Sequence, residues 1–397
     1  MATRRDITKK YARAYQHADK IEKTRLLDGL VETTGWTRDH ARRAIRQALA
    51  RTGAVSQQKR RPRPRKYSYD ALLVLQEVWR LSGAPSGKYL AAIMDDTLAR
   101  LVRFNELGNV QNRITPEVLD EVYSMSAATI DRYLKPYKDA QLPVALSGTK
   151  PSHILRSQIP IRTAMDGTPN DPGFYELDTV AHCGHTLKGE HLWTLTATNP
   201  KYGWTILRTV KNKAFANVHP GLEWVRTHAP TRVTSVDFDN GSEFLNWAVL
   251  AWCETHKLEV TRGRPYESND NAHVEQRNGD WVRKHAFRYR YEGEHEMRLL
   301  NELWGLVMQR KNHLLPCVKA VGWKHTPAGR KQRVYDNPRT PYARLLAANV
   351  LDERATQKLA AEHEKLNPAL ITRRINKIQQ QLINLAAART QAARPAA

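Results

Sequence analysis

Apolar residues recur at helical spacing through the first fifty positions. In TRLLDGLVETTGWTRDHARRAIRQALAR the pattern predicts a helix, a short turn with Gly35, and a second helix capped by Thr37. The inward face predicted for the second helix consists of Ala41, Ala44, Ile45 and Leu49. Its outward face is basic and carries Arg38, His40, Arg42, Arg43 and Arg46. Two interpretations fit equally well: a DNA-binding helix-turn-helix and a helical hairpin with a solvated face.

A second helical block is predicted from Tyr69 to about Tyr137. Within it, ITPEVLDEVYSMSAATIDRYLKPYK predicts a helix capped by Thr115 and a helix from Ser126 through Leu134. This pair is a second helix-turn-helix candidate. Its DNA contacts are expected from Thr129 and Arg132.

The segment between these blocks, RTGAVSQQKRRPRPRKYS, has no acidic residue and contains two prolines that interrupt any helix. It is predicted to be an extended linker that either lies along DNA or acts as a free charged tether. Its expected phosphate contacts are Arg60, Arg61, Arg63 and Arg65. Two helical units joined in this way favour a bipartite reader of a long DNA site.

The pattern changes to short β-rich runs from Gly173 onward. FYELDTVAH, HLWTLTATNP, GWTILRTVK and RVTSVDFDN predict strands, followed by helices at 241–255 and from 271 to about 285. This order predicts a mixed α/β domain.

The last part of the chain begins with the basic, turn-rich segment KHTPAGRKQRVYDNPRTPYARLL, which predicts a small β element or an extended arm. In the tail, apolar residues advance by alternating steps of four and three at Ile371, Ile375, Ile378, Leu382 and Leu385. This spacing fits a short heptad seam between chains or one amphipathic helix packed on its own chain.

These patterns divide the chain into six predicted segments. They are a helix-turn-helix domain (1–58), a basic linker (59–68), a second helical domain (69–138), a linker (139–172), an α/β core (173–322) and a basic C-terminal region (323–397).

The net charge of the chain indicates the class of molecule that it binds. The 397 residues include 63 Lys and Arg against 40 Asp and Glu, a formal net charge of +23, which favours a polyanion such as nucleic acid. No apolar run approaches the roughly 20 residues of a membrane span, and no apolar stretch follows the basic N-terminus. We therefore expect a cytoplasmic protein with no membrane partner. Three scattered cysteines exclude a disulfide framework.

Three carboxylates stand out by position. Asp178 lies inside the first predicted strand, Asp239 precedes Asn-Gly at the end of another, and Glu275 begins a helix 35 residues further on. Taken singly, they also fit a surface acid, a turn former and a first-turn helix acid. Asp237 lies on the same strand face as Asp239 and is the alternative candidate.

The motif DFDNGSEF followed by RPYESNDNAHVEQRNG resembles the signature of the DDE integrase-core transposases, a superfamily that includes retroviral integrases and bacterial insertion-sequence transposases. The resemblance implies a ribonuclease-H-like catalytic core in which Asp178, Asp239 and Glu275 are catalytic metal ligands. It also implies two Mg²⁺ ions, with Mn²⁺ able to substitute, and homo-oligomers on double-stranded DNA. In a bacterium the protein would associate with the nucleoid.

The chemistry of phosphodiester cleavage agrees with this resemblance. Two Mg²⁺ ions held by carboxylates both activate water and neutralise charge at the phosphate. Asn271 and Lys284, on the helix of Glu275, are expected to contact DNA near the cut, although a helix cap and a solvated face are the plain alternatives. The sequence thus predicts a transposase that cuts transposon ends and joins them to target DNA. The alternatives are a helix-turn-helix regulator with an inactive core and a simple Mg²⁺ nuclease.

Overall fold

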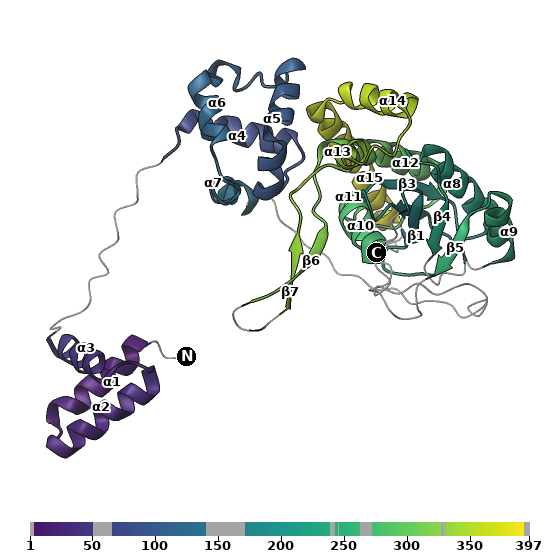
Figure 1. Ribbon diagram of the computed structural model, residues 1–397. Helices are drawn as coiled ribbons and strands as arrows, with labels where there is room; N and C mark the ends of the chain where they lie inside the picture. Colours follow the sequence, from purple (N-terminus) through teal and green to yellow (C-terminus); the bar gives the residue numbers. More distant parts are fainter. Residues whose placement is uncertain are drawn as a thin grey trace. The chain divides into compact units, whose positions relative to one another are not determined.

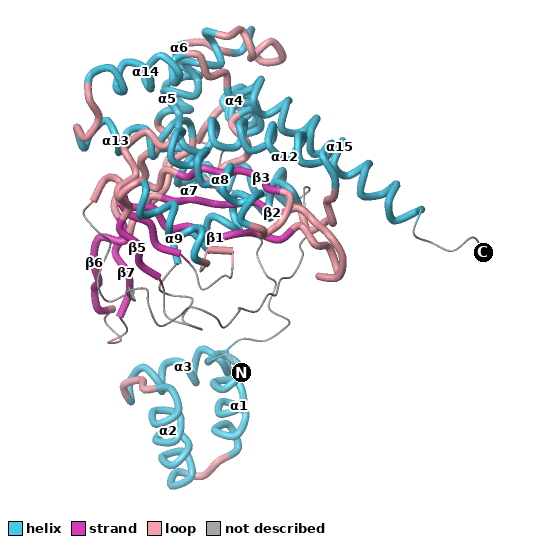
Figure 2. Tube along the Cα trace, turned by 90° about the vertical axis from the view of Figure 1, so that its right-hand side faces the viewer, coloured by secondary structure: helices cyan, strands magenta, loops and turns pink. Residues whose placement is uncertain are grey.

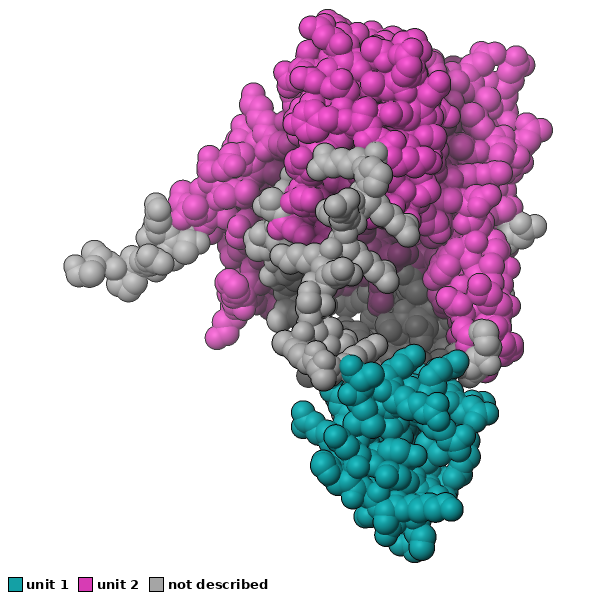
Figure 3. Space-filling model, turned by 90° about the vertical axis from the view of Figure 1, so that its left-hand side faces the viewer, with its two compact units in different colours: residues 1–65 teal, residues 66–397 magenta. Residues whose placement is uncertain are grey.

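The computed structural model describes residues 4–50, 66–139, 171–238, 243–244, 246–262, 272–326, 329 and 331–392. The chain forms two compact units, residues 1–65 and 66–397, which Figure 3 colours separately. None of the described helices combines the length and the apolar character that crossing a bilayer requires. Figure 1 labels the helices and strands.

The first unit contains α1 (Arg4–His17), α2 (Lys20–Thr34) and α3 (Arg38–Ala50). Gly35 ends α2 in the left-handed conformation with φ 68°, so the predicted helix, turn and helix are confirmed. The prediction for Leu49 is wrong, because its side chain is 37% exposed. The buried stripe of α3 advances from Ala41 and Ile45 to Ala48, so Leu49 in the last turn falls outside it.

The second unit begins with a helical part made of α4 (Tyr69–Leu81), α5 (Gly87–Arg103), the 3₁₀ turn η1 (Gln111–Arg113), α6 (Pro116–Tyr123) and α7 (Ala127–Asp139). These elements share one apolar core. Thr115 caps α6 by accepting a bond from the Val118 N–H, and the Ser126 hydroxyl accepts one from Thr129 N–H. The two predicted caps are therefore confirmed, while α7 continues beyond Leu134 to Asp139.

A five-stranded mixed sheet follows, in the order β3-β2-β1-β4-β5. The strands are β1 (Phe174–Ala181), β2 (Trp193–Thr198), β3 (Thr205–Val210), β4 (Ser235–Phe238) and β5 (Glu259–Arg262). The first three are antiparallel, whereas β4 and β5 run parallel to β1. The four predicted strands are present, and β5 was not predicted because its four residues, Glu259–Arg262, give no clear alternation of apolar and polar positions.

Helices cover both faces of this sheet (Figure 2). On one face, α8 (Phe215–His228) and α9 (Trp247–Thr255) pack against Tyr175 and Leu177 of β1. The helix expected from position 241 begins instead at Trp247, since the Asn246 side chain caps it by accepting a bond from Val249 N–H.

The other face carries the alternate β1 residues, including Asp178 and Val180. It is covered by α10 (Ala272–Arg277), the π-helix η3 (Asn278–Arg283), α11 (Lys284–Ala286) and α12 (Gly293–Met308). The predicted helix from 271 to about 285 is thus a continuous helical segment with a π-helical middle.

The C-terminal part contains the π-helix η4 (Gln309–Leu314), β6 (Ala320–His325), β7 (Lys331–Tyr335), α13 (Pro341–Ala348), α14 (Glu353–Glu364) and α15 (Pro368–Ala392). Strands β6 and β7 form an antiparallel hairpin, which confirms the predicted β element.

Helix α15 packs on its own chain, so the heptad seam between chains is wrong and the amphipathic alternative is correct. Ile371, Ile375, Ile378 and Leu382 are buried in one core with α12 residues. The Thr372 hydroxyl also donates to the Leu81 carbonyl at 2.8 Å, which ties α15 to the end of α4. An apolar stripe with this spacing can pack against any complementary apolar surface. Here that surface is the core of the same chain.

Candidate active site

Asp178 lies in the middle of β1, half-buried, on the sheet face covered by α10 and η3. Its carboxylate accepts a hydrogen bond from the side-chain amide of Asn278 and another, at 2.6 Å, from the Thr179 backbone N–H. Both bonds orient a charged oxygen pair beside the helix. A strand-held carboxylate of this kind offers hard oxygen ligands at a fixed place.

Glu275 lies on α10, near enough to Asp178 for the two carboxylate charges to interact. Partial burial raises the pKa of Glu275, the negative charge of Asp178 raises it further, and Arg283 lowers it. A bound cation reduces the repulsion between two neighbouring carboxylates at the protein surface. The donor set therefore fits a divalent metal ion.

Glu176 explains why these two carboxylates meet although 96 residues separate them in the chain. It is completely buried on β1, two residues before Asp178, and accepts bonds at 3.2 Å from Val274 N–H and from the His273 ring nitrogen. These bonds fasten the first turn of α10 to β1. Glu176 was not predicted from the sequence, and the signal that could have found it was a second acid on the same strand face.

Asn278 is a positioning residue that was not predicted from the sequence either. It is buried, lies three residues after Glu275, and donates from its side-chain amide to Asp178. It opens the π-helix η3, and π-helical turns are rare and frequently occur at functional sites.

We expect Asn278→Ala to lower metal-dependent cleavage about 10–100-fold, as for residues that orient a metal ligand. Higher Mg²⁺ should restore part of the loss, because the mutation misplaces Asp178 without removing it. A Mg²⁺ titration of the cleavage rate measures this. Unchanged metal dependence would contradict the positioning role.

The end of β4 lies beside Asp178 in the sheet. Phe238 pairs with Leu177, and Asp237 pairs with Glu176. Asp237 is completely buried and accepts a bond from the Thr261 hydroxyl. Asp239 and Asn271 lie outside the described residues. Among the residues that the structure describes, no cluster of three or more His, Cys, Asp or Glu side chains is placed to hold a metal ion.

The remainder of the DNGSEF motif packs next to Asp178. Glu243 is buried, forms an ion pair with Lys213 at 2.6 Å, and accepts a bond from the Thr179 hydroxyl. Phe244 is also buried and stacks on Phe238 with ring centroids 4.8 Å apart. The Thr179 hydroxyl thus ties the motif to β1, the ion pair ties it to the segment after β3, and the aromatic stack ties it to the end of β4.

The predicted DNA contacts on α3 are all exposed, and several are paired. Arg38 pairs with Asp28, Arg42 lies 3.4 Å from Asp39, and Arg43 lies 3.3 Å from the His40 ring. Arg46 is exposed on the same helix. All these pairs are on the surface and are therefore weak.

In the second helical part, Thr129 does not present a DNA-binding surface. It is buried, and its hydroxyl contacts Ser126 and accepts a bond from Arg132 at 3.0 Å. The prediction for Thr129 is wrong because its hydroxyl forms hydrogen bonds within the first turns of α7. Arg132, in contrast, is exposed. Lys284 is exposed and lines a cavity together with Arg277. The linker arginines 60, 61, 63 and 65 lie outside the described residues.

Comparisons with known proteins give one relative over most of the chain. The protein is 31% identical over 348 residues to a Sinorhizobium fredii protein named "Uncharacterized protein y4rM", a match that covers 87% of this chain and 95% of that one. No family model matches the chain. Among solved structures it is similar to the catalytic core domain of BIV integrase, with 14% identity and a TM-score of 0.31, over 45% of this chain and 96% of that one. A likeness of this size assigns no activity.

Proposed function

The chain belongs to the same family as the y4rM protein of Sinorhizobium fredii, and we propose that it is a DDE-type transposase that cuts transposon-end DNA and joins it to target DNA. The mixed five-stranded sheet with helices on both faces supports the ribonuclease-H-like core that the motif resemblance implies.

One observation carries the proposal: β1 and α10 bring Asp178 and Glu275 together, with Asn278 bonded to Asp178 and Glu275 repelled by it. These are the first and third acids of the motif. Asp239 is assigned by its position directly after Phe238, whose strand neighbour Leu177 directly precedes Asp178. A regulator with an inactive core has no need to keep two mutually repelling carboxylates oriented in this way.

The proposed metal ligands are Asp178, Asp239 and Glu275. Two Mg²⁺ ions there would activate the attacking water or 3′-hydroxyl and neutralise charge at the phosphate. The protein's own part is to hold the carboxylates: Glu176 fixes α10 to the sheet, and Asn278 orients Asp178. Mn²⁺ has the same preference for carboxylate oxygen and is expected to substitute.

The direct test is cleavage of duplex DNA that carries the ends of the protein's own mobile element, with Mg²⁺, Mn²⁺ or EDTA. Nicking at the 3′ end and joining to a supercoiled target, both abolished by EDTA, are the expected results. End-specific binding with no nicking in either metal would favour the regulator. Nicking without joining would favour a simple nuclease.

Helix α3 is proposed as a DNA-reading element, because its exposed face carries arginines on a unit that folds as a separate compact body. We expect the combined change of Arg42, Arg43 and Arg46 to Gln to weaken binding of end DNA. The log–log salt slope should flatten by about 0.9 for each phosphate that the variant no longer neutralises. Fluorescence anisotropy over a salt series measures both quantities.

A matched control removes the same charge elsewhere on this unit. Lys9, Lys10 and Arg13 are exposed on α1, and changing all three to Gln should alter binding much less. Equal losses in the two triple variants would mean that only net charge matters, and α3 would then not be the reading helix.

A further inference from the structure

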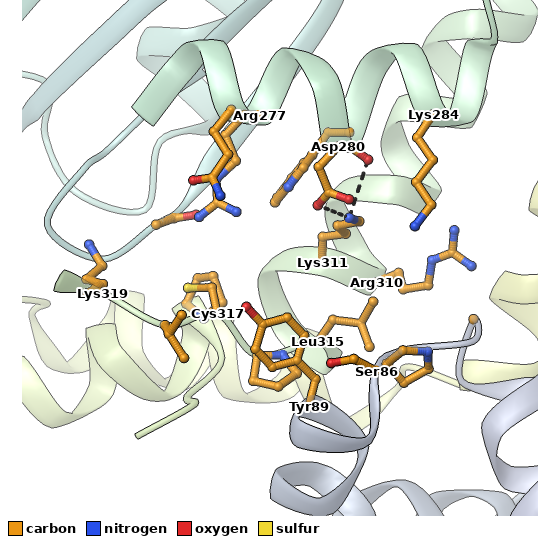
Figure 4. Close-up of a pocket in the computed structure, with 18 of the residues that line it drawn as sticks. Ser86, Tyr89, Arg277, Asp280, Lys284, Arg310, Lys311, Leu315, Cys317 and Lys319 are labelled. Atoms are coloured by element: carbon orange, nitrogen blue, oxygen red, sulfur yellow. Dashed lines mark hydrogen bonds and ion pairs between the residues drawn. The ribbon is translucent and has the colours of Figure 1, made fainter. Parts of the chain in front are cut away.

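A cavity of about 1430 Å³ lies against α10 and η3. Its walls are the turn between α4 and α5, the helical segment from α10 to α11, the π-helix η4 and the hairpin of β6 and β7 (Figure 4). His273, which contacts Glu176, also lines it, so the cavity begins next to the proposed active site.

The cavity is strongly basic. Its two lining carboxylates are already neutralised, since Asp280 pairs with Lys311 and Asp336 pairs with Arg344 at 2.6 Å. Five further cations line it and form no ion pair with a carboxylate among the described residues: Arg277, Lys284, Arg310, Lys319 and Arg333. An anionic ligand would neutralise this excess of positive charge.

Among these cations, Arg310 gives the strongest indication of a bound anion, because only 7% of its surface is exposed. It donates to the Nε2 atom of His285 at 2.8 Å, while its own Nε–H has no hydrogen-bond partner among the described residues. Burial lowers the pKa of Arg310 to about 10. Burying a guanidinium with an unsatisfied donor costs free energy, and an anion bound nearby offsets part of that cost.

The turn at Gly83 is shaped around this guanidinium. Gly83 has φ +87°, and a Cβ atom there would lie 2.7 Å from the Arg310 Nη1 atom. Figure 4 shows Lys284 pointing toward the same side of the cavity as Arg310. The two cations therefore face one region of the cavity.

A second basic group lies on the opposite side, where Figure 4 shows Arg277 above Cys317 and Lys319 to its left. A Cβ atom on Gly203 would lie 2.9 Å from an Arg277 nitrogen and 3.9 Å from the Lys319 Cε atom, so both cations converge on that turn. Burial lowers the pKa of Lys319 to about 7, and the charges of Arg344 and Arg277 contribute.

Aromatic side chains complete the wall at the hairpin. Trp323 and Tyr335 line the cavity yet are 54% and 49% exposed. The Arg333 guanidinium lies 5.1 Å from the Trp323 ring centroid. Exposed aromatic faces interleaved with cations are typical of surfaces that stack unpaired bases and grip their phosphates.

We propose that this cavity binds a short single-stranded segment of the DNA substrate, with backbone phosphates on the two cation groups and on Arg333, and a base stacked on Trp323. The inference depends on the proposed function only for the choice of DNA as the bound nucleic acid. The volume exceeds the roughly 300–1,000 Å³ of small-molecule sites, which favours several nucleotides over one metabolite. A duplex is read by elements placed in its grooves, whereas an open cavity lined by cations and aromatic rings suits unpaired nucleotides.

The test is binding of fluorescein-labelled oligo-dT and of a duplex of equal length to the full protein in EDTA, where no cleavage occurs. The variants are Trp323→Ala and Arg333→Gln, both exposed on the hairpin and outside the proposed metal site. We expect Trp323→Ala to weaken oligo-dT binding about tenfold, from the loss of one stacked base. Arg333→Gln should flatten the salt slope by about 0.7, the value for one contact to a single strand.

The matched control on the hairpin is Lys324→Gln. Lys324 neighbours Trp323 but does not line the cavity, and its strand partner is Gln332. Trp247→Ala, which removes a 64% exposed tryptophan on α9, controls for tryptophan loss. Neither control should change oligo-dT affinity more than twofold.

Three other outcomes overturn the assignment. Absence of oligo-dT binding by the parent protein would do so even if the protein cleaves duplex ends. Equal losses for duplex and oligo-dT would make the cavity part of a duplex-binding surface. Tighter binding of oligo-rU than of oligo-dT would assign the cavity to RNA instead. If end cleavage fails while oligo-dT binding follows the pattern above, the proposed function fails and the cavity assignment stands.

Discussion

Asp178→Asn, Asp239→Asn and Glu275→Gln are each expected to abolish both cleavage and strand joining while leaving binding of end DNA nearly unchanged. Each change removes one charged oxygen from the proposed metal site. The loss should exceed the roughly 10–100-fold effect of residues that only orient a ligand. DNA affinity, in contrast, comes mostly from lysines and arginines elsewhere. Nicking rates and anisotropy on the same DNA separate the two effects.

Asp237→Asn is the matched control for this series. Asp237 is buried and accepts a bond from Thr261, and an asparagine oxygen can accept the same bond. We therefore expect near-parental cleavage from this variant, with its unfolding midpoint measured alongside. An inactive, folded Asp237→Asn beside an active Asp239→Asn would move the second ligand to Asp237.

Elements with strong local signals were predictable from the sequence. Caps such as Thr115 and Ser126 act within three residues, so the helices that they begin could be placed before any tertiary contact was known. The strands that contain Asp178 and Asp237 were also found, since their apolar and β-branched runs are bounded by turn residues. The mixed α/β arrangement follows from the order of these elements.

The fine geometry of the site depends on contacts that the sequence leaves unspecified. Glu176 was visible only as a second acid on the strand of Asp178, and the docking of α10 on β1 gives it its two donors. Thr129 looked exposed on a basic helix, but packing turned it inward against Ser126. Which residues of a helix face the core depends on the partner surface as well as on the helical period.

The cavity likewise could not be foreseen, because its walls come from segments far apart in the chain. Gly83, Arg310 and Trp323 belong to three different elements, and none of them lies in a recognisable motif. The excess charge of +23 predicted an anionic partner, but gave no position for it. Arg310 becomes informative only once its burial and its unpaired donor are known.

The burial of α15 changes the expected role of the tail. A heptad seam would make residues 366–397 an assembly element whose removal spares nicking at single ends. Instead, Arg389 forms an ion pair with Glu296 at 2.6 Å, and Asn367 donates to Glu106 at 2.7 Å. Removing the tail would expose the core under α12 and cut its ties to α5. We therefore expect the truncated protein to misfold, so the tail is not the element that would join copies in the proposed homo-oligomer.

Leu382→Ala is expected to lower the free energy of unfolding of the second unit by about 2–5 kcal/mol, the usual range for a buried leucine. Leu382 is completely buried in the core shared by α12 and α15. Urea unfolding of the full protein measures the effect, with the slope checked for a change in cooperativity. The change should not depend on protein concentration, because the contact lies within one chain.

Leu370→Ala on the same helix is the control. Its side chain is 46% exposed, so the substitution should change the free energy of unfolding by no more than about 0.5 kcal/mol. If α15 were a seam between copies, Leu382→Ala would instead shift a monomer–oligomer equilibrium and its effect would vanish on dilution. Sedimentation velocity at several concentrations, run beside the urea series, distinguishes the two cases. A loss of stability seen equally at every concentration establishes the tail as part of the core that holds α11 and α12 behind the proposed active site.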